Sequence, residues 1–202
     1  MIIRKTTLIL IMGTSLLLGG TTVTAQNGTA LAEKCERCHG NNGNSDKKQV
    51  PNITGLSSTY FIDTMEKFRN DKRPGKKFKT SGHEETDMNA IAKNISHEDF
   101  AVLADYYATQ TFIPRQQTVD SALVRQGKKV YRKRCKKCHT DNGSNSDDDA
   151  GRLAGQWMPY LEFQLEQFSS GVRTPSKKMK KQLKKLKDGD IQALLNFFAA
   201  QQ

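Results

Sequence analysis

The sequence predicts an all-α protein built from two tandem domains, and three observations support this. Apolar residues recur at helical spacing, no segment shows the alternation of a strand, and the two halves carry one shared pattern of motifs. The chain has 202 residues, which is enough for two small domains. We expect residues 26–112 to form the first domain, residues 113–120 a linker and residues 121–202 the second domain.

The N-terminal segment, residues 1–25, has the layout of a secretory signal peptide. Arg4 and Lys5 precede an apolar run from Leu8 to Leu18, and small residues lead from there to Ala25. A charged start, a short apolar middle and a small-residue exit are typical of a cleaved leader, and the run is short for a membrane span. We therefore expect cleavage after Ala25 and export to the periplasm, with an uncleaved N-terminal anchor as the alternative.

The four cysteines all lie in two C-x-x-C-H motifs, 100 residues apart. This pentapeptide is the attachment signature of haem c, in which two thiols bind the porphyrin and the adjacent histidine binds the iron. A thioredoxin-like pair would require a βαβ pattern, and a zinc finger would require much closer motifs. We expect two covalently bound haem c groups, each with its iron, attached at Cys35, Cys38, Cys135 and Cys138, with His39 and His139 as iron ligands.

The internal repeat extends beyond the cysteines. Adding 100 to a residue number aligns Cys35 with Cys135, Gly55 with Gly155, Tyr60 with Tyr160, Phe68 with Phe168 and Arg73 with Arg173. Further along, a shift of 91 aligns Met88 with Met179, Asp99 with Asp190 and Tyr107 with Phe198. The first half therefore contains nine extra residues within Pro74 to Asp87, and their Pro, Gly, Lys and Ser content predicts a surface loop.

Each half is expected to contain three helices in the same order. A helix leads into the haem motif, an amphipathic helix follows, and a third helix closes the half. The expected spans are Thr29 to Cys35, Tyr60 to Phe68 and Phe100 to Tyr107 in the first half, and Ser121 to Lys137, Tyr160 to Phe168 and Ile191 to Ala200 in the second. Ser96 is the expected cap of the first closing helix, with Asp99 three residues later, and Asp188 precedes the second closing helix.

Methionine is the expected second iron ligand in both halves, because its thioether favours the reduced iron of an electron-transfer haem. Met88 and Met179 match under the repeat, and each precedes the closing helix by the same interval. Met65 lies on the apolar face of its helix, so core packing is its expected role. His83 and His97 are competing ligands in the first half only, and we expect both to be surface residues.

These motifs and their order resemble the di-haem cytochromes of the cytochrome c4 family, over essentially all of residues 26–202. The resemblance implies two class I cytochrome c domains related by a pseudo-twofold axis, with haems close enough to exchange electrons. It also implies a periplasmic carrier of single electrons between respiratory partners, towards a terminal oxidase. In this family a proline carbonyl commonly accepts the N–H of the proximal histidine; Pro51 fits that place, whereas the second half has Gly151.

The charge distribution suggests what the protein binds. Gln26 to Ile113 contains 12 basic and 12 acidic residues, whereas Pro114 to Gln202 contains 18 basic and 9 acidic residues, a net charge of +9. The basic residues crowd around Met179 and the second haem motif, which predicts an acidic redox partner. Peripheral association with anionic lipid stays open, and we expect no nucleic-acid partner.

Three functions fit the motifs in different degrees. We expect an electron carrier and no enzyme activity, with the cytochrome subunit of a larger dehydrogenase, such as a sulfide-oxidising flavocytochrome, as the alternative. A di-haem peroxidase would need one iron with an open coordination site. The matched pair Met88 and Met179 leaves neither iron open, so this third function is disfavoured.

Overall fold

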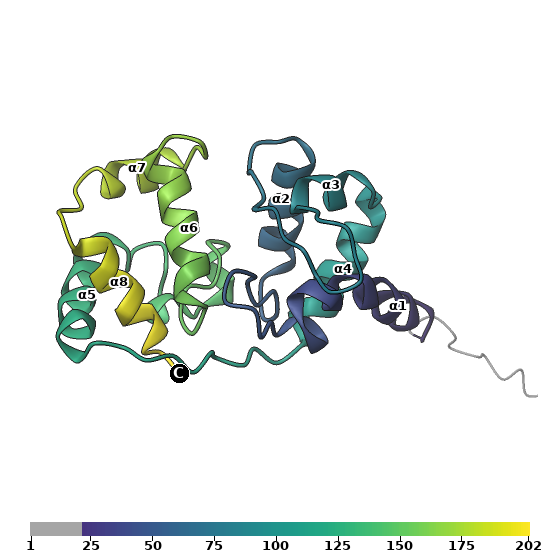
Figure 1. Ribbon diagram of the computed structural model, residues 1–202, viewed down its shortest axis with the longest axis horizontal. Helices are drawn as coiled ribbons and strands as arrows, with labels where there is room; N and C mark the ends of the chain where they lie inside the picture. The colour runs from purple at the N-terminus through teal and green to yellow at the C-terminus, as the bar shows by residue number, and fades with distance from the viewer. Residues whose placement is uncertain (1–21) are drawn as a thin grey trace, which may run out of the picture.

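This computed structural model describes residues 22–202, which form eight α-helices and three 3-10 turns (Figure 1). Capping residues and glycine-containing turns separate these elements. In chain order the elements are α1 (Thr22–His39), η1 (Asn41–Gly43), α2 (Ser58–Arg69), α3 (Met88–Lys93), α4 (His97–Thr109), α5 (Ser121–Arg134), η2 (Asp141–Gly143), η3 (Ser146–Asp148), α6 (Met158–Ser169), α7 (Lys177–Leu183) and α8 (Asp190–Ala199). Among these residues no strand forms, and Phe78 and Thr86 pair as an isolated antiparallel bridge. The prediction of an all-α protein is confirmed.

The two halves of the repeat form two separate helical units. Helices α1 to α4 make one unit and α5 to α8 the other, joined by an extended segment that follows α4 (Figure 1). Equivalent backbone hydrogen bonds confirm the alignment predicted from the sequence. The N–H of Gly55 donates to the carbonyl of Tyr107 at 3.1 Å, and the N–H of Gly155 donates to the carbonyl of Phe198 at 2.9 Å. Each bond ties the loop after the haem motif to the closing helix of its own unit.

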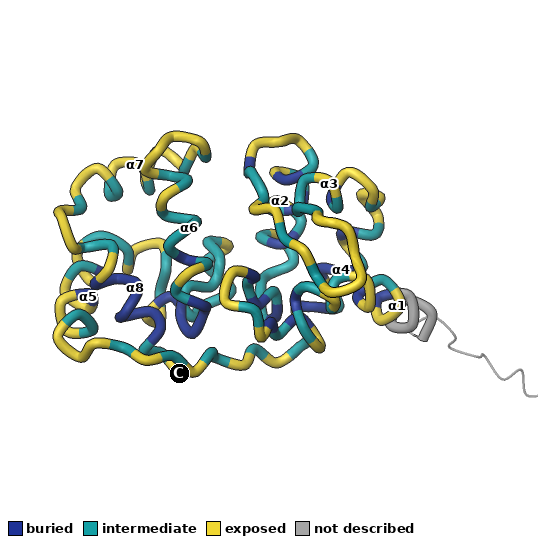
Figure 2. Tube along the Cα trace, viewed as in Figure 1, coloured by how far each residue is buried: buried dark blue, intermediate teal, exposed yellow. Residues whose placement is uncertain are grey.

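Each unit has its own hydrophobic core (Figure 2). The helix that leads to the haem motif packs on the closing helix in both units, and the contact of α5 with α8 is very close. An ideal Cβ on Gly127 of α5 would lie 2.0 Å from the carbonyl oxygen of Ala193 in α8, so only glycine fits this crossing. The buried core residues are Ala32, Phe61, Met65, Phe68, Ala92, Phe100, Leu103, Ala104 and Tyr107 in the first unit, and Tyr131, Leu161, Leu194, Leu195, Phe197 and Phe198 in the second.

Buried polar contacts hold the two units together. Gln156 and Asn52 are 2 % and 1 % exposed, and they exchange two hydrogen bonds. The Asn52 N–H donates to the Gln156 Oε1 at 3.0 Å, and the Gln156 Nε2 donates to the Asn52 carbonyl at 2.7 Å. Beside them the indole N–H of Trp157 donates to the carbonyl of Ser45 at 2.9 Å. Because buried polar groups left unpaired are costly, these bonds fix the relative position of the units.

The helices that lead into the haem motifs differ from their predicted bounds. Helix α1 runs through the whole first motif to His39 and stops at Gly40, whose φ of +74° is the left-handed conformation that often ends a helix. Helix α5 instead ends at Arg134, before the second motif. Residues 1–21 of the predicted signal peptide lie outside the described residues. No helix within residues 22–202 is long and apolar enough to cross a membrane.

Two short helices, α3 and α7, were not predicted. Each begins at or just before a candidate methionine ligand and is capped by a side chain that accepts a backbone N–H. Asp87 caps α3 by accepting from Ala90 at 2.9 Å, and Ser176 caps α7 by accepting from Met179 at 3.2 Å. The caps therefore fix the backbone at both methionines.

The two closing helices begin in different ways. Ser96 caps α4, because its hydroxyl accepts the N–H of Asp99 at 3.0 Å as expected. The N-cap of α8 is Gly189, with φ +80°, and it contributes no side chain. The carboxylate of Asp190, the first residue of α8, accepts the N–H of Lys187 at 2.9 Å and so stabilises the turn that precedes the helix.

Candidate haem-binding sites

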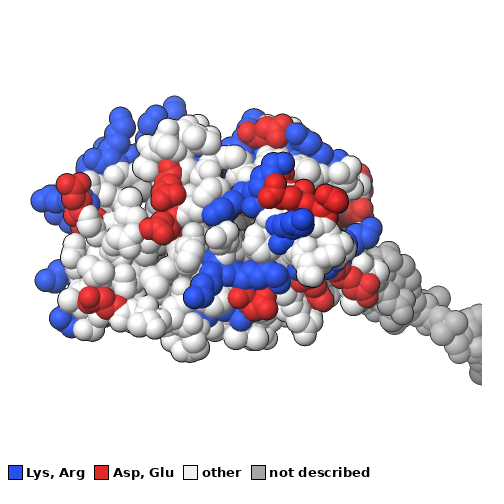
Figure 3. Space-filling model, in the orientation of Figure 1, with Lys and Arg blue, Asp and Glu red and all other residues white. Residues whose placement is uncertain are grey.

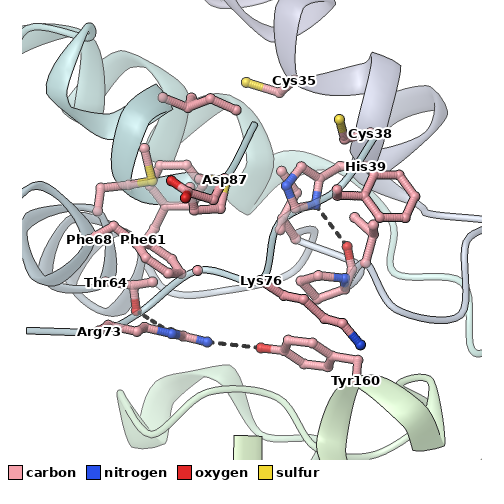
Figure 4. Close-up of a pocket in the computed structure, with 18 of the residues that line it drawn as sticks. Cys35, Cys38, His39, Phe61, Thr64, Phe68, Arg73, Lys76, Asp87 and Tyr160 are labelled. Atoms are coloured by element: carbon pink, nitrogen blue, oxygen red, sulfur yellow. Dashed lines mark hydrogen bonds between the residues drawn. The ribbon is translucent and has the colours of Figure 1, made fainter. Parts of the chain in front are cut away.

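The N-terminal unit contains an apolar cavity of about 480 Å³ that brings together all four of its predicted site residues. Cys35, Cys38, His39 and Met88 line it, together with core side chains of α2 and α4. Figure 4 shows the two cysteines at one end of the cavity, as expected for thiols one helical turn apart on α1. The volume and the apolar lining are typical of a cofactor site.

His39 is held in place by a backbone carbonyl. Its Nδ1 lies 2.9 Å from the carbonyl oxygen of Pro51, the contact that the resemblance implied (Figure 4). Since a carbonyl only accepts, Nδ1 carries the proton and Nε2 is the ring nitrogen left to bind a metal. Burial lowers the pKa of His39, against the opposing effect of the Pro51 bond, so the neutral imidazole is the form present near pH 7.

The nine-residue insertion covers the N-terminal cavity. Pro74, Gly75, Lys76, Phe78 and Thr86 belong to the predicted surface loop and line the cavity. The loop is closed on itself because the N–H of Phe78 donates to the carbonyl of Thr86 at 2.8 Å, and the reverse bond measures 3.0 Å. The insertion therefore forms part of the wall of this cavity, and the second unit has no corresponding segment.

The competing histidines do not line the N-terminal cavity. His83 contacts the guanidinium of Arg37, with 3.4 Å between His83 Nδ1 and Arg37 Nη1. His97 Nδ1 lies 2.8 Å from the carboxylate of Glu66. Both are exposed, as predicted, and Met65 is buried in the core of its unit. Met88 therefore lines the cavity and also aligns with a methionine of the second half, Met179.

The C-terminal unit has the same donor set in a narrower cavity of about 90 Å³. Cys135, His139 and Met179 line it, whereas Cys138 is exposed and lies outside the lining. Here the motif forms a turn after α5, in which the N–H of His139 donates to the carbonyl of Cys135 at 3.1 Å. Burial and, to a smaller extent, the neighbouring Cys138 raise the pKa of Cys135 to about 11. Three of the four predicted residues are therefore brought together.

The histidine of the second motif lacks the hydrogen bond found in the first. Burial lowers the pKa of His139, and the nearby Gly151 carbonyl partly offsets this, but Nδ1 has no hydrogen-bond partner. The Gly151 carbonyl therefore does not reproduce the hydrogen bond that the Pro51 carbonyl makes with His39. Gly151 has φ +74°, a conformation closed to proline, so the chain turns differently beside His139 than beside His39.

Haem fits both sites by the chemistry of their donors. Each cavity wall combines a soft thioether, an imidazole whose pKa is lowered by burial and at least one thiol of the C-x-x-C-H motif, inside an apolar lining. Two helical units of this kind, joined by buried hydrogen bonds, define a two-domain c-type cytochrome. Sequence reasoning found these residues but overlooked the role of Gln156 and of the repeat pairs Tyr60/Tyr160 and Arg73/Arg173, which meet between the domains.

Comparisons with known proteins agree with this class. Residues 25–111 match the family model "Cytochrome c", and residues 122–198 match "Cytochrome C oxidase, cbb3-type, subunit III". The chain is 31 % identical to cytochrome c4 of Azotobacter vinelandii over 185 residues, covering 86 % of this chain and 87 % of that protein. It therefore belongs to the cytochrome c4 family.

Solved structures show the same two-domain arrangement. The crystal structure of reduced recombinant cytochrome c4 from Pseudomonas stutzeri superposes with a TM-score of 0.71 at 27 % identity, covering 87 % of this chain and 97 % of that one. A thiosulfate dehydrogenase (TsdBA) from Marichromatium purpuratum gives a TM-score of 0.70 at 25 % identity, over 87 % of this chain and 40 % of that one. The protein is an electron-transfer cytochrome that carries two covalently bound haem c groups.

Proposed function

We propose that the protein is an exported, freely diffusing carrier that passes single electrons between respiratory partners in the periplasm, towards a terminal oxidase. Membership of the cytochrome c4 family supports electron transfer, and the surface charge supports a diffusing carrier. The observation that carries the proposal is a concentration of unpaired basic side chains around the C-terminal haem site.

In this proposal each iron has one histidine and one methionine ligand. His39 and Met88 serve the N-terminal iron, and His139 and Met179 serve the C-terminal iron. Cys35, Cys38, Cys135 and Cys138 form the thioether bonds. A haem supplies the one-electron chemistry, and the protein's part is to orient the imidazoles, exclude water with the apolar linings and keep both axial positions filled. Filled axial positions suit a carrier rather than a peroxidase.

The C-terminal unit exposes a surface that we call the basic rim. Its members lie on and after α7 and along α5 into the second motif, and Figure 3 shows positive side chains along this outer edge of the unit. The basic rim consists of Lys177, Lys178, Lys180, Lys181, Lys184, Lys185 and Lys187 together with Arg125, Lys128, Lys129, Arg132, Lys133, Arg134, Lys136 and Lys137. Within residues 22–202, none of these side chains forms an ion pair, whereas every ion pair found lies in the N-terminal unit.

The basic rim favours an acidic protein as the partner. Unpaired charges of one sign around a redox site speed the encounter with a partner of opposite sign, and this steering weakens as salt screens the charges. Arg134 of the basic rim lines the C-terminal cavity together with Cys135 and Met179, so a protein docked on the rim would approach the C-terminal haem. Electrons would then leave or enter through that haem.

The test is the rate of electron transfer to membranes or an oxidase preparation from the source cells, at increasing ionic strength. The double variant Lys180→Glu/Lys181→Glu is compared with Lys72→Glu/Lys79→Glu, which changes the charge equally on exposed residues of the N-terminal unit. We expect a steep fall of the rate with salt and a loss of at least tenfold for the first variant only. Equal rates for both variants, or a rate independent of salt, would count against the rim as the docking surface.

A subunit of a larger dehydrogenase is the second candidate. The similar unit that occupies 40 % of a thiosulfate dehydrogenase chain supports it, because the same fold serves there inside an enzyme. The size of the native haem protein after gentle extraction separates the two functions. A mass of one or two chains supports the carrier, and a large assembly that contains a flavoprotein or another dehydrogenase supports the subunit.

A further inference from the structure

Two arginines from different units meet at the junction of the domains. Arg73 of the N-terminal unit donates from Nη2 to the hydroxyl of Tyr160 at 3.0 Å and to Oε1 of Gln164 at 2.8 Å. Arg173 of the C-terminal unit donates from Nη1 to the same Gln164 oxygen at 2.6 Å. One amide oxygen therefore receives hydrogen bonds from two guanidinium groups, and the two positive charges lie close together.

The oxygens that accept hydrogen bonds from these arginines belong to the hydroxyls of Tyr60, Tyr160 and Thr64 and to the amide of Gln164, and none is a carboxylate. Within residues 22–202, neither Arg73 nor Arg173 forms an ion pair, although Arg73 is only 3 % exposed. The Nε of Arg73 is buried and has no hydrogen-bond partner. Burial, and then the charge of Arg73, lower the pKa of Arg173 to about 10. Buried charges are normally paired, because leaving them unpaired is costly, so the arrangement calls for an anion.

The repeat places both arginines in the same way. Arg73 lies over the ring of Phe68 at 4.8 Å, and Arg173 lies over the ring of Phe168 at 4.3 Å. Both pairs are related by the same shift of 100 residues that relates the two haem motifs. The fold therefore positions a guanidinium group at the junction twice, once from each domain.

The junction lies at the end of the N-terminal cavity away from the thiols. Arg73, Tyr160 and Gln164 line that cavity, and Figure 4 places Arg73 and Tyr160 opposite Cys35 and Cys38 across it. On a haem, the vinyl groups that react with the thiols lie on one half of the macrocycle and the two propionates on the other half. Gln164 also lines the C-terminal cavity, so the junction lies between the two sites.

We propose that Arg73 and Arg173 form one carboxylate site shared by both domains, which takes the propionates of the N-terminal haem and makes its reduction potential depend on a residue of the C-terminal domain. Guanidinium groups bind carboxylates through paired N–H donors, and the unpartnered Nε of Arg73 is one such donor. Positive charge beside the propionates disfavours the oxidised iron, which carries one more positive charge than the reduced iron. Arg173 thereby acts on the N-terminal haem across the domain boundary.

A spectroelectrochemical titration of the haem-loaded protein tests this, with the two haems followed separately by their NMR signals. The variant is Arg173→Leu, and the control is Asp188→Asn, which changes the net charge by one unit at an exposed position of the same domain. We expect Arg173→Leu to lower the potential of the N-terminal haem by about 59 mV, a tenfold change in its reduction equilibrium. Asp188→Asn should leave that potential close to that of the wild type.

A second substitution separates an electrostatic role from a structural one. Arg173→Lys keeps the charge but not the paired donors, so we expect it to retain more than half of the potential that Arg173→Leu loses. It also provides the comparison with the wild type if Arg173→Leu does not accumulate with haem. An unchanged N-terminal potential in these Arg173 variants, with only the midpoint of thermal unfolding lowered, would overturn the proposal. The potential is measured without any partner, so the result does not depend on the proposed carrier function.

Discussion

Replacing Gln156 by alanine is expected to loosen the contact between the domains. The substitution removes both hydrogen bonds with Asn52, measured at 3.0 and 2.7 Å, and leaves the N–H and the carbonyl of Asn52 buried without partners. Each buried polar group left unpaired costs about 1–3 kcal/mol, so the expected loss for the two groups is about 2–6 kcal/mol. For a protein of this size, that corresponds to a fall of roughly 4–24 °C in the midpoint of thermal unfolding.

The assay is thermal unfolding of the haem-loaded protein, followed by far-ultraviolet circular dichroism. Gln192→Ala is the matched control, because Gln192 is exposed and bonds only within its own domain, to Glu162 at 2.6 Å. An exposed substitution of this kind changes stability by about 0.5 kcal/mol or less. If Gln156→Ala unfolds within about 2 °C of the control, these bonds do not hold the domains together and the reasoning fails.

Three further predictions concern four other residues. Gly127→Ala should lower the free energy of unfolding in urea by about 3 kcal/mol, because its Cβ would clash with the backbone of α8, and an unchanged midpoint would contradict this. Met88→Ala and Met179→Ala should each abolish one of two methionine-ligated absorption spectra and leave the other; the loss of both, or of neither, would refute the ligand assignment. Gly151→Ala should lower the free energy of unfolding in urea by about 1–3 kcal/mol, because the φ of Gly151 is +74° and an added Cβ would lie 2.5 Å from the Tyr60 hydroxyl oxygen. A free energy equal to that of the wild type would contradict this prediction.

The repeat made much of the fold predictable from the sequence. Covalent attachment of haem requires the fixed spacing of the C-x-x-C-H motif. In both halves, the glycine that follows the haem loop bonds to the closing helix. The shifts of 100 and 91 residues therefore carried over to the structure as the matched bonds of Gly55 with Tyr107 and of Gly155 with Phe198. Apolar periodicity sufficed for the long helices α2 and α6, because each buries one face in its core.

What the sequence did not predict depends on contacts between distant residues or on single side chains. Helices α3 and α7 have only six and seven residues, too few for a periodic signal, and each depends on one capping side chain. The hydrogen bond missing at His139 follows from the local backbone at Gly151, which composition does not reveal. The pairing of Arg73 with residues of the other domain requires the domains to be docked, and no periodicity within one half encodes that.

The insertion before Met88 makes the two haem sites unequal. Its residues line the N-terminal cavity, whereas the C-terminal cavity is narrower and has Arg134 in its lining. The two haems would therefore have different neighbouring side chains and charges. Burial and nearby charge both tune the potential of a haem iron, so we expect the two irons to differ in potential.

The most direct test of the account is a redox titration of the purified protein with its haem content measured on the same sample. Two covalently bound haems per chain, two one-electron steps at different potentials and no spectral change on adding cyanide are the results that we predict. A single haem per chain, or a haem that binds cyanide rapidly, would contradict the account, because one of the two sites would then lack its cofactor or its second axial ligand.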